Sequence, residues 1–225
     1  MSDETHGDEP APWAMQLVLH MRKQDAPSRT ELCEAAARAV VGLLTAPDAA
    51  AGGLWLDALT TWAKDGRIRK HARRARGATW DAVQELPGVT ATVGRAQVRA
   101  FPPCPVDVVP APIRKLQLSG SEPDELGAVD PSTFPVGSVI VHISAAPALS
   151  LGKAAAAAAH AAQLALASMP DERREAWRAL GYPVSVVHPD VAGWAQAQTE
   201  ADVTVHDGGF TEVAPNTVTS VARWH

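Results

Sequence analysis

Residues 151–163 read LGKAAAAAAHAAQ, and this alanine-rich segment decides how the rest of the chain is interpreted. Alanine is the best helix former, so the segment predicts a helix that opens around Gly152 and Lys153. The first backbone N–H groups of such a helix have no partner within it, which makes the helix start a candidate anion site. At roughly 100° per residue, Lys153, Ala157 and His160 share one face of the helix. The helix therefore presents a cation and an imidazole to a single surface.

A structural interpretation of the same segment is also open. A helix of small residues can pack closely on a sheet, with Lys153 exposed to solvent and His160 buried and hydrogen-bonded. The spacing of the residues does not separate the two interpretations, so other segments have to decide between them.

Two further segments are informative when they are combined with this helix. Residues 138–143 (SVIVHI) predict a strand just before it, and residues 206–211 read HDGGFT. In this order the segments resemble the type 2 peptidyl-tRNA hydrolase family. That family has a Gly-Lys helix start, a His seven residues after the Lys, and a later Asp-x-Gly-x-Thr hairpin. The resemblance runs from about Val136 to Trp224.

The resemblance implies hydrolysis of the ester that joins a peptide to the 3′ adenosine of tRNA. Peptidyl-tRNA would be the partner, and Lys153, Asp207 and Thr211 would be the catalytic residues. Lys153 would bind a phosphate or stabilise the ester oxyanion. Asp207 would act as base or orient the attacking water, and Thr211 would donate a hydroxyl hydrogen bond. The alternative for Asp207 is a turn-forming role before two glycines.

Substrate contacts are expected from Gly152, His160 and Gly209. A glycine after Asp207 lets the backbone bend sharply and approach a ligand. No His, Cys and carboxylate cluster has metal-ligand spacing, so we expect no metal and no cofactor.

The chain departs from the family's pattern in two places. Residues 144–150 (SAAPALS) lack the acidic residue and the lysine that usually precede the helix, and Ala157 stands where the family has Gln. Gln163 and Arg223 are candidates to replace these side chains. The departures leave a second hypothesis open, namely a catalytically weakened tRNA-binding or scaffolding protein that retains the fold.

Composition restricts the class of protein. The chain has 225 residues, of which 46% are hydrophobic, as in an ordinary globular core. The first ten residues are acidic and polar, and no apolar run is long enough for a bilayer, so we expect a cytoplasmic protein without membrane contact. Cys33 and Cys104 form no CxxC or metal spacing, and we expect both to be reduced.

Charge is distributed unevenly along the chain. Residues 1–118 hold 15 of the 20 Lys and Arg against 13 acids and residues 119–225 hold 5 against 12, so the net charges by subtraction are +2 and −7. Residues 67–76 (RIRKHARRAR) form a basic run that could neutralise several phosphates. The candidate substrate-binding residues within it are Arg69, Lys70, Arg73 and Arg74. The run contains no aromatic residue, so backbone contact is expected rather than base stacking; a solvated surface run is the alternative.

Several features of the first half return in the second. Residues 17–21 (LVLHM) line up with residues 139–143 (VIVHI), and an alanine-rich helical pattern follows each run. Trp62 corresponds to Trp177, and Trp80 corresponds to Trp194. We interpret the chain as three parts: residues 12–118 are a degenerate hydrolase-like repeat, residues 119–135 a linker, and residues 136–225 a type 2 peptidyl-tRNA hydrolase-like domain.

Each half predicts a strand, a helix, a second helix, a strand, a third helix and a closing β-hairpin. The expected fold class is therefore α/β, with two similar three-layer-type α/β halves, each a small mixed sheet flanked by helices. The first two strands of each sheet are expected to be parallel. Residues 28–31 (SRTE) form a capping box for a helix that runs to about Leu44. Gly66 and Gly181 are expected to end the second helix of each half.

The first half lacks the predicted site residues. Glu31 stands at the position of Lys153, Arg38 at that of His160, Gly94 near that of Asp207, and Val98 near that of Thr211. Members of the resembled family pair as homodimers, so a fused inert copy can replace one subunit. We therefore expect an intramolecular pseudo-dimer, and no higher oligomer is implied.

Overall fold

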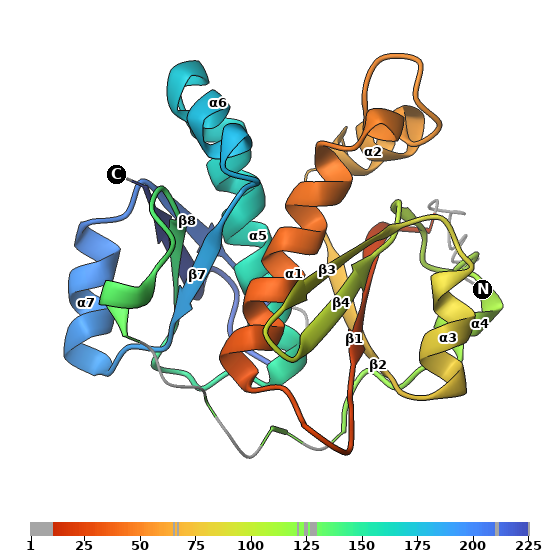
Figure 1. The fold of residues 1–225 in the computed structure, drawn as a ribbon, viewed down its shortest axis with the longest axis horizontal. Coiled ribbons are helices and arrows are strands. Elements are labelled where there is room, and N and C mark those ends of the chain that lie inside the picture. Colours follow the sequence, from red (N-terminus) through yellow and green to blue (C-terminus); the bar gives the residue numbers. More distant parts are fainter. Residues whose placement is uncertain are drawn as a thin grey trace, which may run out of the picture.

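Two mixed sheets flanked by helices form the molecule, which makes it an α/β protein (Figure 1). The structure is a computed structural model, and it describes residues 11–64, 66, 68–120, 122–123, 126, 130–209 and 212–224. This architecture confirms the predicted α/β class and the presence of two small mixed sheets.

The first sheet has the strand order β2-β1-β4-β3. Its strands are β1 (Trp13–His20), β2 (Lys70–Ala75), β3 (Val89–Val93) and β4 (Ala96–Ala100), and the short β5 (Cys104–Pro105) pairs with β1. β1 and β2 are parallel, whereas the β1/β4 and β3/β4 pairs are antiparallel. The basic run predicted at 67–76 is thus largely a strand at the edge of this sheet.

The second sheet repeats this arrangement with the order β7-β6-β9-β8. Its strands are β6 (Val139–Ile143), β7 (Val184–Val187), β8 (Val203–His206) and β9 (Val218–Arg223). β6 and β7 are parallel, and the β6/β9 and β8/β9 pairs are antiparallel. Both halves therefore have the predicted parallel first pair and closing antiparallel pair.

Local sequence signals place the helices well. The helices are α1 (Arg29–Leu44), α2 (Leu56–Lys64), α3 (Ala78–Gln84), α4 (Ala111–Arg114), α5 (Leu151–Ser168), α6 (Asp171–Ala179) and α7 (Val191–Thr199), with 3-10 turns η1 (Pro47–Ala49) and η2 (Pro131–Thr133). The predicted capping box of Ser28 and Glu31 is present at the start of α1. Gly66 and Gly181 follow α2 and α6 with φ of +69° and +76°, in the left-handed region that glycine tolerates.

Helices α1 and α5 lie side by side between the two sheets and join the halves (Figure 1). Their alanines, for example Ala36 and Ala158, are fully buried and belong to one hydrophobic cluster that includes residues of both sheets. Small side chains allow two helices to approach closely while every methyl group is removed from water. A larger side chain at such a position is expected to cost roughly 1–3 kcal/mol through overpacking.

The repeated tryptophans form equivalent hydrogen bonds. Trp62 Nε1 donates to the Arg69 carbonyl at 3.1 Å, and Trp177 Nε1 donates to the Pro183 carbonyl at 2.8 Å. Arg69 therefore corresponds to Pro183, and the strand registers then match Met15 with Val139. The sequence alignment matched Leu17 with Val139 and was wrong by two residues. A shift of two leaves every side chain on the same face of a strand, so the hydrophobic pattern does not reveal it.

The closing hairpins differ more than the sequence suggested. Leu19 lies opposite Val98 and Ile143 lies opposite Ser220, so Val98 corresponds to Ser220 and not to Thr211. β3 and β4 are joined by Gly94 and Arg95 alone, whereas the connection from β8 to β9 spans residues 207–217. This longer loop of the second half has no counterpart in the first.

Two further findings concern the described part of the chain. Cys33 is buried and Cys104 is half-buried, and both are free thiols. No helix there has the length and apolar character needed to cross a bilayer.

Candidate functional site

A groove of about 880 Å³ lies where the two halves meet. One wall is β2 of the first half, the floor is α5, and the other wall is the end of β8 with the following loop. Six of the predicted site residues line it: Arg69, Lys70, Gly152, Lys153, His160 and Asp207. The fold thus brings most of the predicted site together, although the residues come from distant segments.

Lys153 and Asp207 form an ion pair in this groove. The Lys153 Nζ lies 2.5 Å from the Asp207 Oδ2, and the two side chains are 16% and 19% exposed. The other carboxylate oxygen of Asp207 accepts the Gly209 N–H at 2.8 Å. Asp207 therefore forms a turn, in agreement with the structural interpretation, and at the same time contacts the predicted catalytic lysine.

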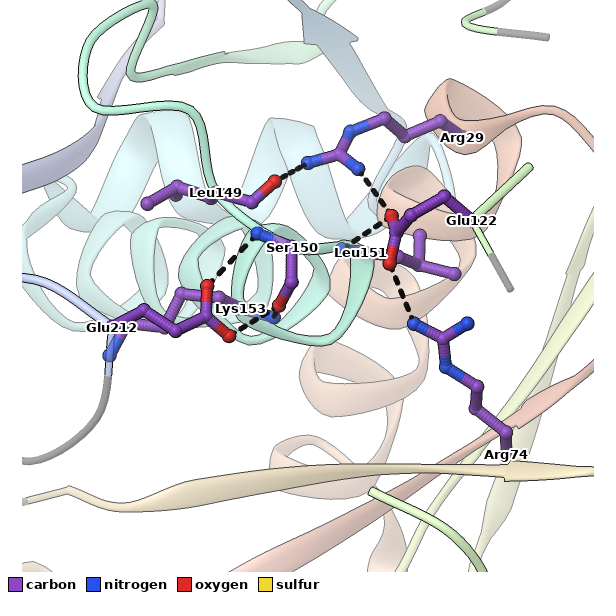
Figure 2. A network of polar contacts seen from close by, with 8 residues as sticks. All are labelled: Arg29, Arg74, Glu122, Leu149, Ser150, Leu151, Lys153 and Glu212. Carbon is purple, nitrogen blue, oxygen red and sulfur yellow. Dashed lines mark hydrogen bonds and ion pairs between the residues drawn. The ribbon is translucent and has the colours of Figure 1, made fainter. Parts of the chain in front are cut away.

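The N-terminus of α5 is not an open anion site. Ser150 is its N-cap and its Oγ accepts the Lys153 N–H at 3.3 Å. The Glu212 carboxylate accepts the Ser150 N–H at 3.0 Å and the Ser150 hydroxyl at 2.5 Å (Figure 2). The expectation of unpaired amides at the helix start was wrong here, because this carboxylate of the protein itself binds there.

A second carboxylate, Glu122, binds the next amide of the same helix. It accepts the Leu151 N–H at 2.8 Å and forms ion pairs with Arg29 at 2.9 Å and Arg74 at 2.8 Å (Figure 2). Glu122 lies in the segment predicted to be a linker, and it connects the starts of α1 and α5 with β2. A carboxylate near a helix N-terminus is favourable because it faces the positive end of the helix dipole.

His160 and Lys70 meet at the far end of the groove. The Lys70 Nζ donates to Gln163 Oε1 at 2.5 Å and lies 5.1 Å from the centroid of the Trp62 ring. Burial lowers the pKa of Lys70 well below its usual value. Burial, with a smaller contribution from the charge of Lys70, lowers the pKa of His160 to about 3. His160 is therefore a neutral imidazole near pH 7, able to donate or accept but not to supply positive charge.

The basic run is divided along the length of β2. Arg69 and Lys70 line the groove, whereas Arg73 and Arg74 do not. Arg73 binds the Gln16 side chain at 2.9 Å, and Arg74 binds Glu122. The structure therefore brings Arg69 and Lys70 to the groove, whereas Arg73 and Arg74 lie further along β2 and outside it, so the four side chains do not form one surface.

The remaining predicted residues either lie outside the described residues or have other partners. Thr211 and Arg67 lie outside the described residues. Arg223 pairs with Glu200 and does not line the groove, and Gln163 is the partner of Lys70. The described residues contain no group of three or more His, Cys, Asp or Glu that could hold a metal ion.

The two glycines of the predicted site differ in their structural need. A Cβ on Gly209, which has φ of +76°, would lie 2.4 Å from the Pro215 nitrogen, so only glycine fits. A Cβ on Gly152 would meet the Ala72 Cβ at 3.6 Å, an ordinary contact. Glycine is thus required by the fold at 209 and not at 152.

Sequence reasoning missed Ser150, Glu122 and Glu212. Ser150 carried a local signal, since serine before a helical segment is a common N-cap. The two glutamates carried none, because their contacts join residues 29 and 62 positions apart.

A second and smaller groove, of about 360 Å³, occupies the corresponding place at the start of α1. Here Glu31 pairs with Arg95 at 3.4 Å, and its Oε1 accepts the Arg95 N–H at 3.0 Å. Glu34 accepts the Val186 N–H of β7 at 2.9 Å, and Arg38 donates to the Val184 carbonyl at 3.4 Å. In this groove the helix supplies the acid and the hairpin the base, whereas in the first groove the helix supplies Lys153 and the loop after β8 supplies Asp207.

Comparison with family profiles, characterised proteins and solved structures gives no match to the chain.

Proposed function

We propose that the chain hydrolyses the ester bond of peptidyl-tRNA and releases peptide and free tRNA. The observation that carries the proposal is the Lys153–Asp207 pair, partly exposed in a groove large enough for a ligand. A carboxylate beside an ammonium supplies a base and a group that favours negative charge at one point. The resemblance of the same residues to the type 2 peptidyl-tRNA hydrolase motifs supports this assignment.

The proposed reaction is direct attack of water on the ester carbonyl. The Asp207 carboxylate accepts a proton from the water while the water oxygen bonds to the carbonyl carbon. The Lys153 ammonium stabilises the oxyanion that develops on the carbonyl oxygen. As the C–O bond to the ribose breaks, the 3′ oxygen takes the proton and leaves as a hydroxyl. For this step the substrate has to replace part of the direct contact between Lys153 and Asp207.

The wall of the groove gives a reason to favour a tRNA ester over an uncharged one. Arg69 and Lys70 border the groove and neither belongs to the half that carries Lys153. The Arg69 cation in the wall of the same groove favours a polyanionic substrate such as tRNA over an uncharged ester. This arrangement also gives the first half a role in binding.

A second candidate function is tRNA binding or scaffolding without hydrolysis. The observation that favours it is the occupation of the α5 N-terminus by Glu122 and Glu212, together with the direct Lys153–Asp207 contact. These contacts have to change before a substrate can use the same groups.

A hydrolysis assay separates the two candidates. Purified protein is mixed with peptidyl-tRNA, and free tRNA is followed with time. The hydrolase proposal predicts release by wild type and its loss in Asp207→Asn, which keeps the Gly209 hydrogen bond to Oδ1 but removes the charge. Binding of tRNA without release by wild type would instead support the second candidate.

A further inference from the structure

The wall of the groove formed by β2 is a strand edge that is open at Lys70 and Ala72 and is bridged by Gln117 at Arg74. β2 is the last strand of its sheet and pairs with β1 on one side. Successive backbone groups point to alternate sides of a strand. The Met15 N–H binds the Arg69 carbonyl and the Arg74 N–H binds Gln117, so the groups of Lys70 and Ala72 point away from β1. Among the described residues, none forms a hydrogen bond with the Ala72 N–H.

The equivalent edge in the second half is closed by side chains of α1. The tryptophan hydrogen bonds match Lys70 with Val184, and therefore Ala72 with Val186. Glu34 binds the Val186 N–H and Arg38 binds the Val184 carbonyl. On α5 the matching positions hold Ala156 and His160. The alanine methyl cannot reach the strand, so the edge of β2 stays open at Ala72.

The open edge continues from the proposed reaction centre. Gly152, next to Lys153, packs on Ala72, whereas Lys70 contacts Gln163 about three turns further along α5. From Lys153 to Leu164 the helix rises about 16 Å at 1.5 Å per residue. An extended chain of about five residues spans this length at 3.3 Å per residue. Apolar Ile68 and Leu164 line the far end.

We propose that the groove binds the peptide part of the substrate as an additional strand on the edge of β2. The ester lies at Lys153 and Asp207, and the peptide runs toward Ile68 and Leu164. A peptide carbonyl accepts the Ala72 N–H, and a peptide N–H donates to the Lys70 carbonyl. Main-chain pairing of this kind binds peptides with little dependence on their sequence. This inference rests on the proposed function and specifies the substrate class, namely acyl groups of two or more residues.

The test is direct binding of probes that cannot be hydrolysed. Adenosine 3′-amides carrying one to four alanines and a terminal fluorescein are titrated with the full chain, and fluorescence anisotropy gives the affinity. We expect affinity to rise with the second and third residue. N-methylation of the amide that binds the Lys70 carbonyl should weaken binding about three- to tenfold, the range for one net hydrogen bond.

A variant imitates the closed edge of the other half. Ala156→Gln places an amide oxygen where Glu34 stands in the smaller groove, so the affinity should no longer rise with peptide length. Ala167→Gln is the matched control, because Ala167 is exposed on the same helix and does not line the groove. It should bind all probes as wild type does.

The outcomes keep this inference distinct from the proposed function. Equal affinity of wild type for all lengths, with no effect of N-methylation, would overturn strand addition even if peptidyl-tRNA is hydrolysed. Length-dependent binding sensitive to N-methylation in a protein that releases no tRNA would support strand addition and contradict the hydrolase. The N-methyl series uses wild type, so it remains decisive if Ala156→Gln does not fold.

Discussion

The two grooves occupy corresponding places in the two halves and are closed to different degrees. At the start of α1, Glu31 pairs with Arg95, and Glu34 and Arg38 bind the edge of β7. At the start of α5 the pair is Lys153 with Asp207, and no α5 side chain is hydrogen-bonded to the backbone edge of β2 among the described residues. Different side chains on the two helices and the longer β8–β9 connection of the second half thus accompany a groove of more than twice the volume.

The comparison also shows how one half can depend on the other. Each groove has a helix from one half as its floor and an edge strand from the other half as a wall. β2 and the residue before it supply Lys70 and Arg69, whereas β7 (VSVV) carries no charge. The half without the predicted catalytic residues therefore supplies the basic wall of the groove that has them.

The largest expected effect comes from removing the cation of the open groove. Lys153→Ala should cost roughly 2–4 kcal/mol of transition-state stabilisation, about 30- to 1,000-fold in kcat/KM, if the ammonium stabilises the oxyanion. Arg95→Ala removes the corresponding cation of the closed groove and should leave hydrolysis unchanged. The measurement is release of free tRNA from peptidyl-tRNA. An unchanged rate in Lys153→Ala would exclude the lysine from the mechanism.

The next largest effect is expected in the salt dependence of tRNA binding, which should differ between the two ends of the basic run. Replacing Arg69 and Lys70 with alanine should weaken tRNA binding and flatten its dependence on salt, by about 0.7–0.9 in log–log slope for each phosphate that is no longer neutralised. Replacing Arg73 and Arg74 should change the slope much less, because these two side chains do not line the groove. Filter binding at several salt concentrations gives both slopes. Similar slopes for the two variants would mean that the groove wall has no special role.

A smaller effect is expected in the pH dependence of stability. His160 has a pKa of about 3 when folded and about 6.5 in an unfolded chain, so below pH 6.5 the unfolded state binds the proton first. The free energy of unfolding should therefore fall as pH decreases from 6.5 toward 3, by at most about 1.4 kcal/mol per pH unit from this group.

His160→Gln should reduce this loss, whereas the arginine at the matching position of α1 does not titrate in this range. Urea unfolding at pH 7 and pH 4.5 measures the difference. His142 and His188, with pKa values lowered to about 4 by burial, should leave part of the slope in the variant. An equal loss of stability in wild type and variant would show that His160 is not kept neutral by its surroundings.

The smallest effect is expected at the start of α5. Gly152→Ala adds a methyl at an ordinary contact distance and a better helix former, so the free energy of unfolding should change by no more than about 1 kcal/mol. Gly209→Ala should be clearly more destabilising, since it forces a side chain into a left-handed backbone and against Pro215. Thermal unfolding of both variants measures the difference. A lower stability of Gly152→Ala than of Gly209→Ala would contradict the prediction.

Much of the fold could be predicted because its signals are local. The capping box of Ser28 and Glu31, the glycines after α2 and α6, and the alanine content of α5 all act within a few residues. The adjacency of Lys153 and Asp207 also followed from sequence, through motifs in a fixed order. The resemblance pointed to Thr211 as well, which lies outside the described residues.

Other features of the site depended on the tertiary structure. Glu122 and Glu212 reach the start of α5 across long separations in the chain, and no local pattern marks such interactions. The register of the repeat was wrong by two residues, because a strand has a side-chain period of two and the pattern is the same after that shift.

The sequence by itself determined which segments form helices and strands and which residue types could carry chemistry, because propensity, capping and periodicity are short-range. Only the tertiary structure decided that β2 of the first half faces α5 of the second. It also divided the basic run, placing Arg69 and Lys70 in the groove and Arg73 and Arg74 on internal partners. The physical reason is that a groove between two elements is set by how their side chains pack, and packing joins residues that the sequence does not place together.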